Sequence, residues 1–419
     1  MQRMLLLLPL IGALSAEEYF QITVVDQATG RGVPMVELRT ENAISRYTDS
    51  HGHIAWNEPG LMDRPVYFEV RSHGYRYRAD GLQLATTRGG KARIEIARVN
   101  IAERLYRITG QGIYRDTLLT GGTPPLPDAD GGVLGQDSAQ AVVLGGRVLW
   151  IWGDTSRAAY PLGNFHGSGA WSSLDDDPDV GIRLHYLTKD DLCRAVCPME
   201  GPGPVWLDGL CVVEGRLLAH YARMKSLGEM HEHGLAEWDA SAEVFRKVKE
   251  LPLAETRHPK GHPVAVGEAL LFGTPLPSLR VPATRAAVLD PARYEEVAVP
   301  EVGDGQGPLK VHAGSISWNE HRRRWILVLN QAWGTSMLGE VWYAEADAPV
   351  GPWTPARKIV SHDDYSFYNV VEHPFLARGR HVYFEGTYAS TFSGTKVPTP
   401  RYDYNQVMYR LDLDDPRLR

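Results

Sequence analysis

Two aspartates stand at the open end of a short apolar hairpin, where they could act together in acid–base chemistry. Asp137 precedes one apolar run, Asp154 ends the next, and Gly145-Gly146 separates the two runs. Gly-Gly between apolar runs predicts a two-residue turn, because both central positions need a positive φ. The register that this turn sets places Asp137 directly opposite Asp154. Since carboxylates that face each other on a sheet repel, a chain that carries such a pair is expected to use it.

Paired carboxylates are suited to the hydrolysis of a glycosidic bond. Their proximity separates their pKa values, so that one carboxyl stays protonated near neutral pH while the other is ionised. The protonated group can donate to a leaving sugar oxygen, and the carboxylate can act as base or nucleophile. We therefore interpret Asp137 and Asp154 as catalytic candidates. The structural alternative for Asp154, within Trp-Gly-Asp-Thr, is that it accepts N–H bonds in a turn.

The apolar hairpin recurs at intervals of about 50 to 60 residues along the second part of the chain. Each copy is an apolar strand, a tight turn and a second apolar strand. Such repetition predicts a β-propeller with one blade for each copy. The copies span residues 137–154, 205–223, 262–274, 312–330 and 371–388. We therefore predict an all-β chain with a five-bladed propeller and little helix.

The first strand of each blade lines the central channel of a propeller, so its start and the end of the second strand lie at one face. Convergent polar groups at such a concave site mark a functional pocket. We expect Glu372 and Glu385 to assist catalysis there. The same hairpin register predicts four more opposed pairs at this face: Asp208 with Tyr221, Gly261 with Thr274, His312 with Asn330, and Glu372 with Glu385.

The candidates for substrate binding share a polar or aromatic side chain in or beside this ring of residues. They are Asp208, Tyr221, Arg223, His312, Asn330, His373, Tyr388, Trp171, His166 and Arg157. His312 and Asn330 are expected to orient the substrate, and the arginines to bind a carboxylated or sulfated sugar. Structural alternatives stay open, namely core positions for the histidines and tryptophans and surface positions for the arginines. Further aromatic residues that could stack on sugar faces are Trp152, Tyr160, Phe165, Trp333 and Tyr368.

Composition and charge narrow the class of partner. The chain has 419 residues, 43% of them hydrophobic and 23% charged, which is typical of a globular protein of one or two domains. A net charge of -7 argues against a nucleic acid held by phosphate contacts. The 42 glycines, 11 tryptophans and 19 tyrosines favour a β-rich protein with many turns and surfaces for stacking on sugars. We expect a carbohydrate partner and a monomer.

The first sixteen residues have the pattern of a secretory signal. Arg3 supplies the positive charge, residues 4–14 form the apolar segment, and small residues end at Ala16. The apolar segment is too short to span a bilayer, and the alternative is a buried first strand. We predict a secreted or periplasmic protein with no membrane insertion after the signal is removed.

Three cysteines are too few for a disulfide framework. At most one bridge is expected, and Cys193 with Cys197 is the candidate pair. Cys211, within an apolar strand, is then a buried thiol.

Two histidine pairs have the spacing of metal ligands, but neither comes with an evident third ligand. They are His231-Glu-His233 and His258-Pro-Lys-Gly-His262. We predict solvated loop or channel positions for them and no metal or other cofactor. The alternative is a structural Ca²⁺ held by the acidic residues.

The N-terminal part resembles a known accessory module. Residues 17–100 alternate in short strands with Thr-Gly-Arg-Gly-Val-Pro and Thr-Asp-Ser-His-Gly turns, which predicts a small β-sandwich. The pattern resembles transthyretin-like, carboxypeptidase-regulatory domains, which implies a spacer or adhesion role. Residues 101–130 form the predicted connector, in which the start could be a strand or a short helix. The propeller takes residues 131–419.

The second part resembles a family of propeller enzymes. The run from Ala344, Ala-Glu-Ala-Asp-Ala-Pro-Val-Gly-Pro-Trp-Thr-Pro, is similar to the outer-strand signature of five-bladed propeller glycosidases, the arabinanase and fructosidase superfamily. The run Gly-Gln-Asp-Ser followed by Leu-Trp-Ile-Trp-Gly-Asp-Thr more narrowly resembles the D-arabinanase-like family. By resemblance, Asp137 and Asp154 are the catalytic acids. The superfamily's third acid has no clear match, and Glu372 and Glu385 are the candidates.

These observations predict a secreted glycoside hydrolase that acts on a poly- or oligosaccharide. One alternative is a non-catalytic propeller that binds a glycan or a protein partner and holds a structural metal. Another is a polysaccharide lyase in which Tyr221 or His312 is the base and Arg223 neutralises a uronate.

Overall fold

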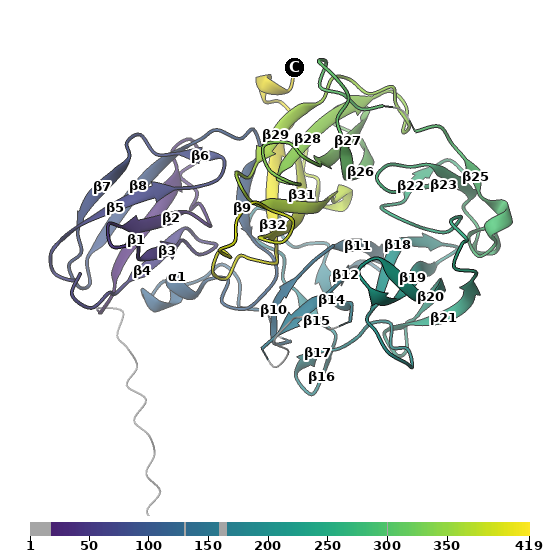
Figure 1. Cartoon of the computed structure of the whole chain (residues 1–419), viewed down its shortest axis with the longest axis horizontal. Helices are drawn as coiled ribbons and strands as arrows, with labels where there is room; N and C mark the ends of the chain where they lie inside the picture. The colour runs from purple at the N-terminus through teal and green to yellow at the C-terminus, as the bar shows by residue number, and fades with distance from the viewer. Residues whose placement is uncertain (1–17, 130, 159–165, 300) are drawn as a thin grey trace, which may run out of the picture. The chain divides into compact units, whose positions relative to one another are not determined.

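The computed structural model describes residues 18–129, 131–158, 166–299 and 301–419, and within them the chain is all-β (Figure 1). The predicted signal segment lies outside the described residues, as do Tyr160 and Phe165. The helices in the described part are short: α1 (Arg115–Leu119), α2 (Arg285–Val288) and the 3₁₀ turns η2 (Pro291–Arg293), η3 (Pro374–Leu376) and η4 (Pro416–Leu418). None of these described helices has the length and apolarity needed to cross a membrane.

The chain forms two compact units. The first takes the chain up to Arg71, Tyr77–Ile96 and Tyr114–Pro124, and the second takes Ser72–Arg76, Ala97–Ile113 and Pro125–Arg419. The strands of the first unit form two sheets. One contains β1 (Phe20–Asp26), β4 (His53–Trp56) and β8 (Lys91–Arg98), and the end of β8 pairs with β6 (Tyr75–Arg76). The other contains β2 (Glu37–Thr40), β3 (Ser45–Tyr47), β5 (Pro65–Arg71) and β7 (Gly81–Ala85).

The core of the first unit lies between these two sheets. Alternating residues of β1 and β2 are buried, as expected for strands with one face turned inward. Trp56 of β4 meets Phe68 of β5 edge to face, with ring centroids 4.9 Å apart. The contact joins a strand of one sheet to a strand of the other.

Five four-stranded antiparallel sheets make up most of the described part of the second unit. Sheet 1 is β11 (Gln140–Leu144), β12 (Arg147–Trp152), β14 (Ser168–Ser173) and β15 (His185–Tyr186). Sheet 2 is β18 (Val205–Val213), β19 (Arg216–Ser226), β20 (Glu229–Asp239) and β21 (Val244–Leu251). Sheet 3 is β22 (Val264–Val266), β23 (Ala269–Phe272), β24 (Leu279–Pro282) and β25 (Glu295–Glu296).

The last two sheets differ in how their fourth strand is supplied. Sheet 4 is β26 (Val311–Asn319), β27 (Arg324–Gln331), β28 (Glu340–Ala346) and β29 (Arg357–Ser361). Sheet 5 is β30 (Ser366–Glu372), β31 (His381–Ala389), β32 (Asn405–Asp412) and, from the far end of the unit's sequence, β9 (Glu103–Arg107). Two small ribbons pair β10 (Val133–Gln136) with β13 (Thr155–Arg157), and β16 (Thr188–Lys189) with β17 (Leu192–Cys193).

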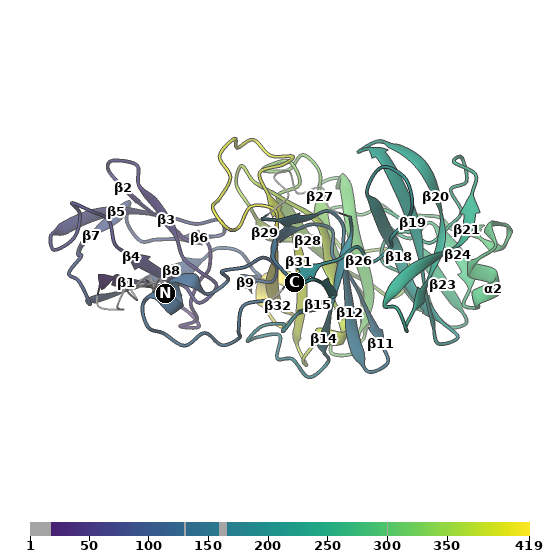
Figure 2. The ribbon, with the colours of Figure 1, turned by 90° about the horizontal axis from the view of Figure 1, so that it is seen from below.

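The five sheets are grouped around a common centre, and their first strands β11, β18, β22 and β26 lie toward it (Figure 1). Figure 2 shows β11, β12 and β26 running along the direction of view of Figure 1.

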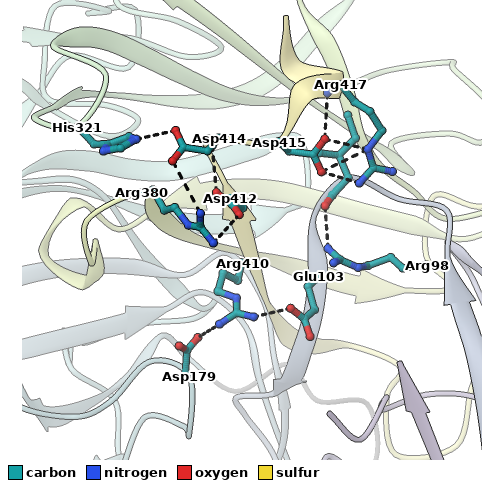
Figure 3. A network of polar contacts seen from close by, with 11 residues as sticks. Arg98, Glu103, Asp179, His321, Arg380, Arg410, Asp412, Asp414, Asp415 and Arg417 are labelled. Carbon is teal, nitrogen blue, oxygen red and sulfur yellow. Dashed lines mark hydrogen bonds and ion pairs between the residues drawn. The ribbon is translucent and has the colours of Figure 1, made fainter. Parts of the chain in front are cut away.

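Strand β9 connects the beginning of the second unit to its end. It pairs with β32 from Val407 opposite Arg107 to Arg410 opposite Glu103. The Arg410 side chain adds an ion pair to Glu103 at 2.6 Å and another to Asp179 at 2.9 Å (Figure 3). The predicted connector, residues 101–130, thus begins with a strand. The sequence is compatible with either a strand or a short helix at this position.

The predicted turns are confirmed in three hairpins. Gly145 and Gly146 have φ of 58° and 77°, as a turn of this kind requires. Val213 pairs with Arg216 and Val266 with Ala269, so the turns lie at Glu214-Gly215 and Gly267-Glu268 as predicted. In sheet 5, Arg378 bridges to His381, so the turn is Gly379-Arg380, one residue later than predicted.

Three of the predicted opposed pairs are wrong by one residue, because bulges and the lengths of the turns change the register that we predict from sequence. Asp208 pairs with His220 rather than Tyr221, after a bulge between Asp208 and Cys211 at which Gly209 has a φ of 63°. Ala313 rather than His312 pairs with Asn330, because the turn between Asn319 and Arg324 sets a register one residue away from the predicted one. An extra residue in one strand shifts every later pair and turns the side chains to the other face.

The third wrong pair lies in sheet 5. Glu372 pairs with Phe384 and Glu385 with Val371, so the two glutamates are one position out of register and not directly opposed. The 3₁₀ turn η3 lengthens this hairpin connection beyond the tight turn that we predict from sequence.

The predicted bridge between Cys193 and Cys197 is not formed. Both thiols are free and buried, as is that of Cys211. Burial raises the pKa of the Cys193 thiol to about 11 and that of Cys197 to about 12, so both are unreactive at neutral pH.

Candidate functional site

A pocket of about 730 Å³ opens where the first strands of the five sheets begin. Each sheet contributes to its lining, from Asp137 before β11, Asp208 in β18, His262 before β22, Ala313 in β26 and Asn369 in β30. The volume is within the range of about 300–1,000 Å³ that is usual for small-ligand pockets. Three carboxyl groups predicted as site residues line it, those of Asp137, Asp154 and Asp208.

The first two carboxyls lie opposite each other, as the hairpin register predicts. The backbone N–H of Asp137 donates to the Asp154 carbonyl at 3.2 Å, and that of Asp154 donates to Asp137 Oδ1 at 2.9 Å. Gly153 sits between them, and a Cβ on that residue would overlap Asp137 Oδ1. The Gly-Asp step therefore lets the Asp137 carboxyl lie directly against the backbone of the opposite strand.

The environment of Asp137 favours its protonated form. Burial and, second, the charge of Asp154 raise the pKa of Asp137 to about 7, while hydrogen bonds from tyrosine hydroxyls oppose the shift. Tyr368 donates one of these bonds to Oδ2 at 3.1 Å, and Tyr404 supplies another. Near neutral pH, Asp137 therefore exists as a mixture of carboxylic acid and carboxylate.

The environment of Asp154 differs from that of its neighbour. Trp206 donates its indole N–H to Asp154 Oδ1 at 2.7 Å. Burial raises the pKa of Asp154, and the Trp206 bond acts in the opposite direction. Burial acts on both carboxyls, and the charge of Asp154 adds to its effect on Asp137. The pair thus offers one acid and one base.

The Asp208 carboxyl, unlike those of Asp137 and Asp154, accepts several hydrogen bonds from N–H groups of the pocket wall. Oδ1 accepts backbone N–H bonds from Gly209 at 2.9 Å and Gly261 at 3.0 Å, as well as the Gln140 side-chain amide. Burial raises its pKa and these donors oppose the shift. The bonds fix Asp208 in the pocket wall and attach the segment before β22 to sheet 2.

Aromatic side chains complete the walls, and most of them were not found from sequence. Trp206, Tyr368, Phe392 and Tyr404 line the pocket, and Phe392 is 45% exposed. Of these, only Tyr368 was predicted. Trp206 precedes Asp208 by two residues, and that spacing along a strand places both on one face, which is a signal that could have identified it. The others come from loops, where sequence periodicity gives no signal.

The structure places the two predicted glutamates behind the pocket rather than in it. Glu385 is fully buried, and its Oε1 lies 2.7 Å from His373 Nε2. Burial raises the pKa of Glu372 to about 7, and its backbone N–H donates to Ser315 at 2.7 Å. Glu372, Glu385 and His373 are therefore corrected from pocket residues to a buried polar group beneath it.

Tyr221 and Arg223 also lie away from the pocket. The Tyr221 hydroxyl donates to Glu232 at 2.6 Å, and Arg223 forms an ion pair with the same carboxylate at 3.2 Å. The bulge that moves Asp208 opposite His220 also turns Tyr221 into the core beside sheet 1. A lyase base at Tyr221 with Arg223 as the neutralising group is therefore not supported.

Five further residues that we predict to contact substrate do not line the pocket and instead pack against neighbouring parts of the chain. Asn330 and Tyr388 are almost fully buried, and the Trp171 indole donates to Glu243 at 2.8 Å. Each lies on the face of its strand that a neighbouring element covers. Arg157 donates to the Cys193 carbonyl at 3.1 Å, and His166 accepts from the Val205 N–H at 3.2 Å. His312 is exposed and lines the pocket.

Of the remaining aromatic candidates, Trp152 is buried in the core and Trp333 is 64% exposed away from the pocket lining. Trp152 is the last residue of β12, whereas Trp333 lies two residues beyond the end of β27.

The prediction of solvated histidines is wrong for His233. It is 1% exposed, and its ring lies beside those of His220 and His258. Burial, followed by the neighbouring histidines, lowers the pKa of His220 to about 2, and burial lowers that of His258 to about 4. The three histidines do not line the pocket, although His220 is the strand partner of Asp208, which does. His231 is exposed, as predicted.

No protein-family model matches the chain, and no curated protein sequence matches it. Among solved structures, an exo-β-1,3-galactanase from Phanerochaete chrysosporium aligns at 11% identity and a TM-score of 0.43, over 67% of this chain and 61% of that one. A GH43_1 enzyme from Xanthomonas citri in complex with xylotriose aligns at 12% identity and a TM-score of 0.41, over 69% and 88% of the two chains.

A third structure, an exo-1,5-α-L-arabinanase from a bovine ruminal metagenomic library, aligns at 10% identity and a TM-score of 0.42. The alignment covers 68% of this chain and 95% of that one. The chain thus spans less than two thirds of the galactanase and most of the other two enzymes. We base the function proposed below on the geometry of the pocket itself.

Proposed function

We propose that this chain is a glycoside hydrolase that cleaves a poly- or oligosaccharide, with Asp137 as general acid and Asp154 as base or nucleophile. The observation that carries the proposal is the pair itself. Two carboxyls face each other across a hairpin at the wall of a pocket, and the pKa of Asp137 is raised to about 7. A group with that pKa can donate a proton at neutral pH.

The two carboxyls divide the reaction between them. Protonated Asp137 donates its proton to the glycosidic oxygen as the C–O bond breaks, so the leaving group departs as an alcohol. Ionised Asp154 then either takes a proton from the attacking water or bonds to the anomeric carbon. If Asp154 bonds to the anomeric carbon, a water molecule then breaks that bond and gives its proton to the Asp137 carboxylate, which restores the acid. If Asp154 acts as base, the proton that it takes from water passes to solvent, and Asp137 takes a proton from solvent.

The walls of the pocket suit a sugar. Trp206 and Phe392 offer flat apolar faces, and Asn369, His312 and Asp208 offer polar groups near them. Sugars present both kinds of surface, because ring C–H groups stack on aromatic faces while hydroxyls form hydrogen bonds. No metal or cofactor takes part in the proposed steps.

The five sheets are proposed to be the blades of a five-bladed β-propeller, and the first unit a transthyretin-like β-sandwich. The contribution of each first strand to one pocket supports the propeller, since such strands line the channel of that fold. The leader-like first sixteen residues support export of a monomeric enzyme to the periplasm or the medium.

A screen of polysaccharides with product analysis tests the proposal. Asp154→Asn and Asp137→Asn are each expected to lower kcat/KM on the cleaved glycan by about 10²–10⁴-fold. Asp347→Asn, whose side chain is 92% exposed at the end of β28, is the matched control and should keep full activity. Full activity in both pocket variants would overturn the proposal. A product that absorbs in the near ultraviolet would show elimination instead of hydrolysis.

A further inference from the structure

Three histidines from separate segments meet outside the acidic pocket. His220 lies on β19, His233 on β20 and His258 on the segment between β21 and β22. One ring nitrogen of each lies within 4.8 Å of those of the other two. The Nε2 of His220 and the Nδ1 of His233 are 2.9 Å apart. We propose that this cluster binds one divalent transition-metal ion of the Zn²⁺ type.

Hydrogen bonds fix which nitrogens are available. His233 Nε2 lies 2.7 Å from the Pro252 carbonyl, and His258 Nδ1 lies 2.9 Å from the Pro259 carbonyl. A carbonyl only accepts, so both of these nitrogens carry hydrogen. The lone pairs are therefore on Nδ1 of His233 and Nε2 of His258. A second ring N–H that donates to a backbone carbonyl is the usual support of a metal-bound histidine.

His220 completes the set by a change of tautomer. Because His233 Nδ1 is the acceptor, His220 donates from Nε2 in the metal-free state. A metal between them requires the His220 proton to move to Nδ1, which frees Nε2. The rings of His220 and His258 are stacked, with centroids 3.8 Å apart. His258 must also turn, since a ring nitrogen binds a metal in the plane of the ring.

The chemistry of the cluster selects the kind of ion. The ligands are neutral imidazoles. The charge of Lys260 acts on His220 and His258, and that of Glu255 acts on His258. Ca²⁺ and Mg²⁺ bind through carboxylate and carbonyl oxygens, whereas imidazole suits Zn²⁺, Cu²⁺, Ni²⁺ and Co²⁺. Three histidines leave the fourth tetrahedral position of Zn²⁺ for water. His220 and His233 are buried and His258 is half-buried, so that position lies on the His258 side.

The proposed ion would hold the pocket wall in place. It would join β19 and β20 to the segment that carries Gly261, whose N–H donates to the Asp208 carboxylate at 3.0 Å. Its role is therefore structural, and it goes beyond the proposed hydrolase function without depending on it.

Metal binding to the full chain, expressed without a histidine tag and treated with a chelator, tests the inference. Zn²⁺ is titrated against a coloured competing chelator, and Co²⁺ is added separately for its absorption spectrum. We expect one Zn²⁺ per chain and the intense visible bands of four-coordinate Co²⁺. Binding of no Zn²⁺, or a weak six-coordinate Co²⁺ spectrum, would overturn the inference, and neither result concerns glycan cleavage.

Two variants make the test specific to the cluster. His258→Ala removes the half-buried ligand and should weaken Zn²⁺ binding by about 100-fold or more. His231→Ala removes an exposed histidine two residues before His233 and should bind Zn²⁺ as the parent chain does. Zn²⁺ should raise the Tm of the parent and of His231→Ala but not of His258→Ala, because binding to the folded state stabilises it. Equal Zn²⁺ affinity in all three proteins would contradict the inference.

Discussion

The indole N–H of Trp206 donates to Oδ1 of Asp154 at 2.7 Å, so a residue of sheet 2 sets the charge of a carboxyl at the edge of sheet 1. The bond stabilises the ionised form and opposes the rise in pKa that burial causes. If Asp154 is the base, this contact keeps it ionised at the pH where Asp137 is still protonated.

Trp206→Phe should therefore raise the pKa of Asp154. A hydrogen bond to a charged group contributes about 1.5–3 kcal/mol, which corresponds to a shift of about one to two pKa units. The acidic limb of the kcat/KM profile should move to higher pH by that amount, while the alkaline limb stays in place. An unchanged acidic limb would mean that Asp154 is not the base.

Tyr368→Phe should act on the other limb. The Tyr368 hydroxyl donates to Asp137 Oδ2 at 3.1 Å and favours the carboxylate, so its removal raises the pKa of Asp137 further above 7. The general acid then stays protonated to higher pH, so the alkaline limb of the kcat/KM profile should move to higher pH. A shift of that limb toward lower pH would contradict the assignment of Asp137 as the acid.

Asp137→Asn should stabilise the fold at alkaline pH. The pKa of Asp137 is higher in the folded chain than in the unfolded chain, so folding is favoured at low pH and this contribution is lost as pH rises through about 7. Asn carries no charge to bury. The shift of about three pKa units corresponds to about 4 kcal/mol, so the variant should gain a few kcal/mol over the parent at pH 8 and clearly less at pH 5, as measured by denaturant unfolding at both pH values. Equal gains at the two pH values would show that charge is not the cause.

Gly153→Ala tests whether the close approach at the pair matters. The added Cβ would overlap Asp137 Oδ1 and displace the carboxyl. Since a displacement of about 1 Å at a reacting group can cost about 100-fold in rate, kcat should fall by about that factor with an unchanged circular dichroism spectrum. Gly307→Ala, where a Cβ meets no described atom within 4 Å, is the matched control. Full activity of Gly153→Ala would show that the pair tolerates displacement.

His373→Ala should destabilise the chain through the buried pair beneath the pocket. It leaves the carboxylate of Glu385 buried without its partner, which costs about 3–5 kcal/mol. The double variant with Glu385→Leu should recover part of that loss, since it removes the stranded charge. Denaturant unfolding of the parent, single and double variants measures both effects. A double variant less stable than His373→Ala would mean that the pair contributes through packing alone.

The elements with regular hairpins could be predicted from sequence, and those with irregularities could not. The Gly-Gly turn fixes the register of sheet 1 through Asp137 and Asp154, because no bulge lies between the turn and the pair. In sheet 2, the bulge at Gly209 moves Asp208 from Tyr221 to His220. A single extra residue carries little periodic signal, yet it decides which side chain reaches the pocket. Trp206 could have been placed by its spacing from Asp208, whereas Phe392 and Tyr404 depend on loop conformation.

The histidine cluster shows a second reason for the limits of sequence. His233 and His258 were singled out by local spacing, but their third partner, His220, lies on a neighbouring strand and shares no motif with them. Only the pairing of β19 with β20 brings it there.

During synthesis, strand β9 leaves the ribosome early, whereas its partner β32 is among the last strands to be synthesised. Strand β9 must remain with an unpaired edge until about three hundred intervening residues have been synthesised, a loop closure of the kind that slows folding. A chain cut short before Asn405 would keep that edge open, exposing it to pairing with other copies. The pairing of β32 with β9 thus removes an open strand edge that the chain carries from early in its synthesis.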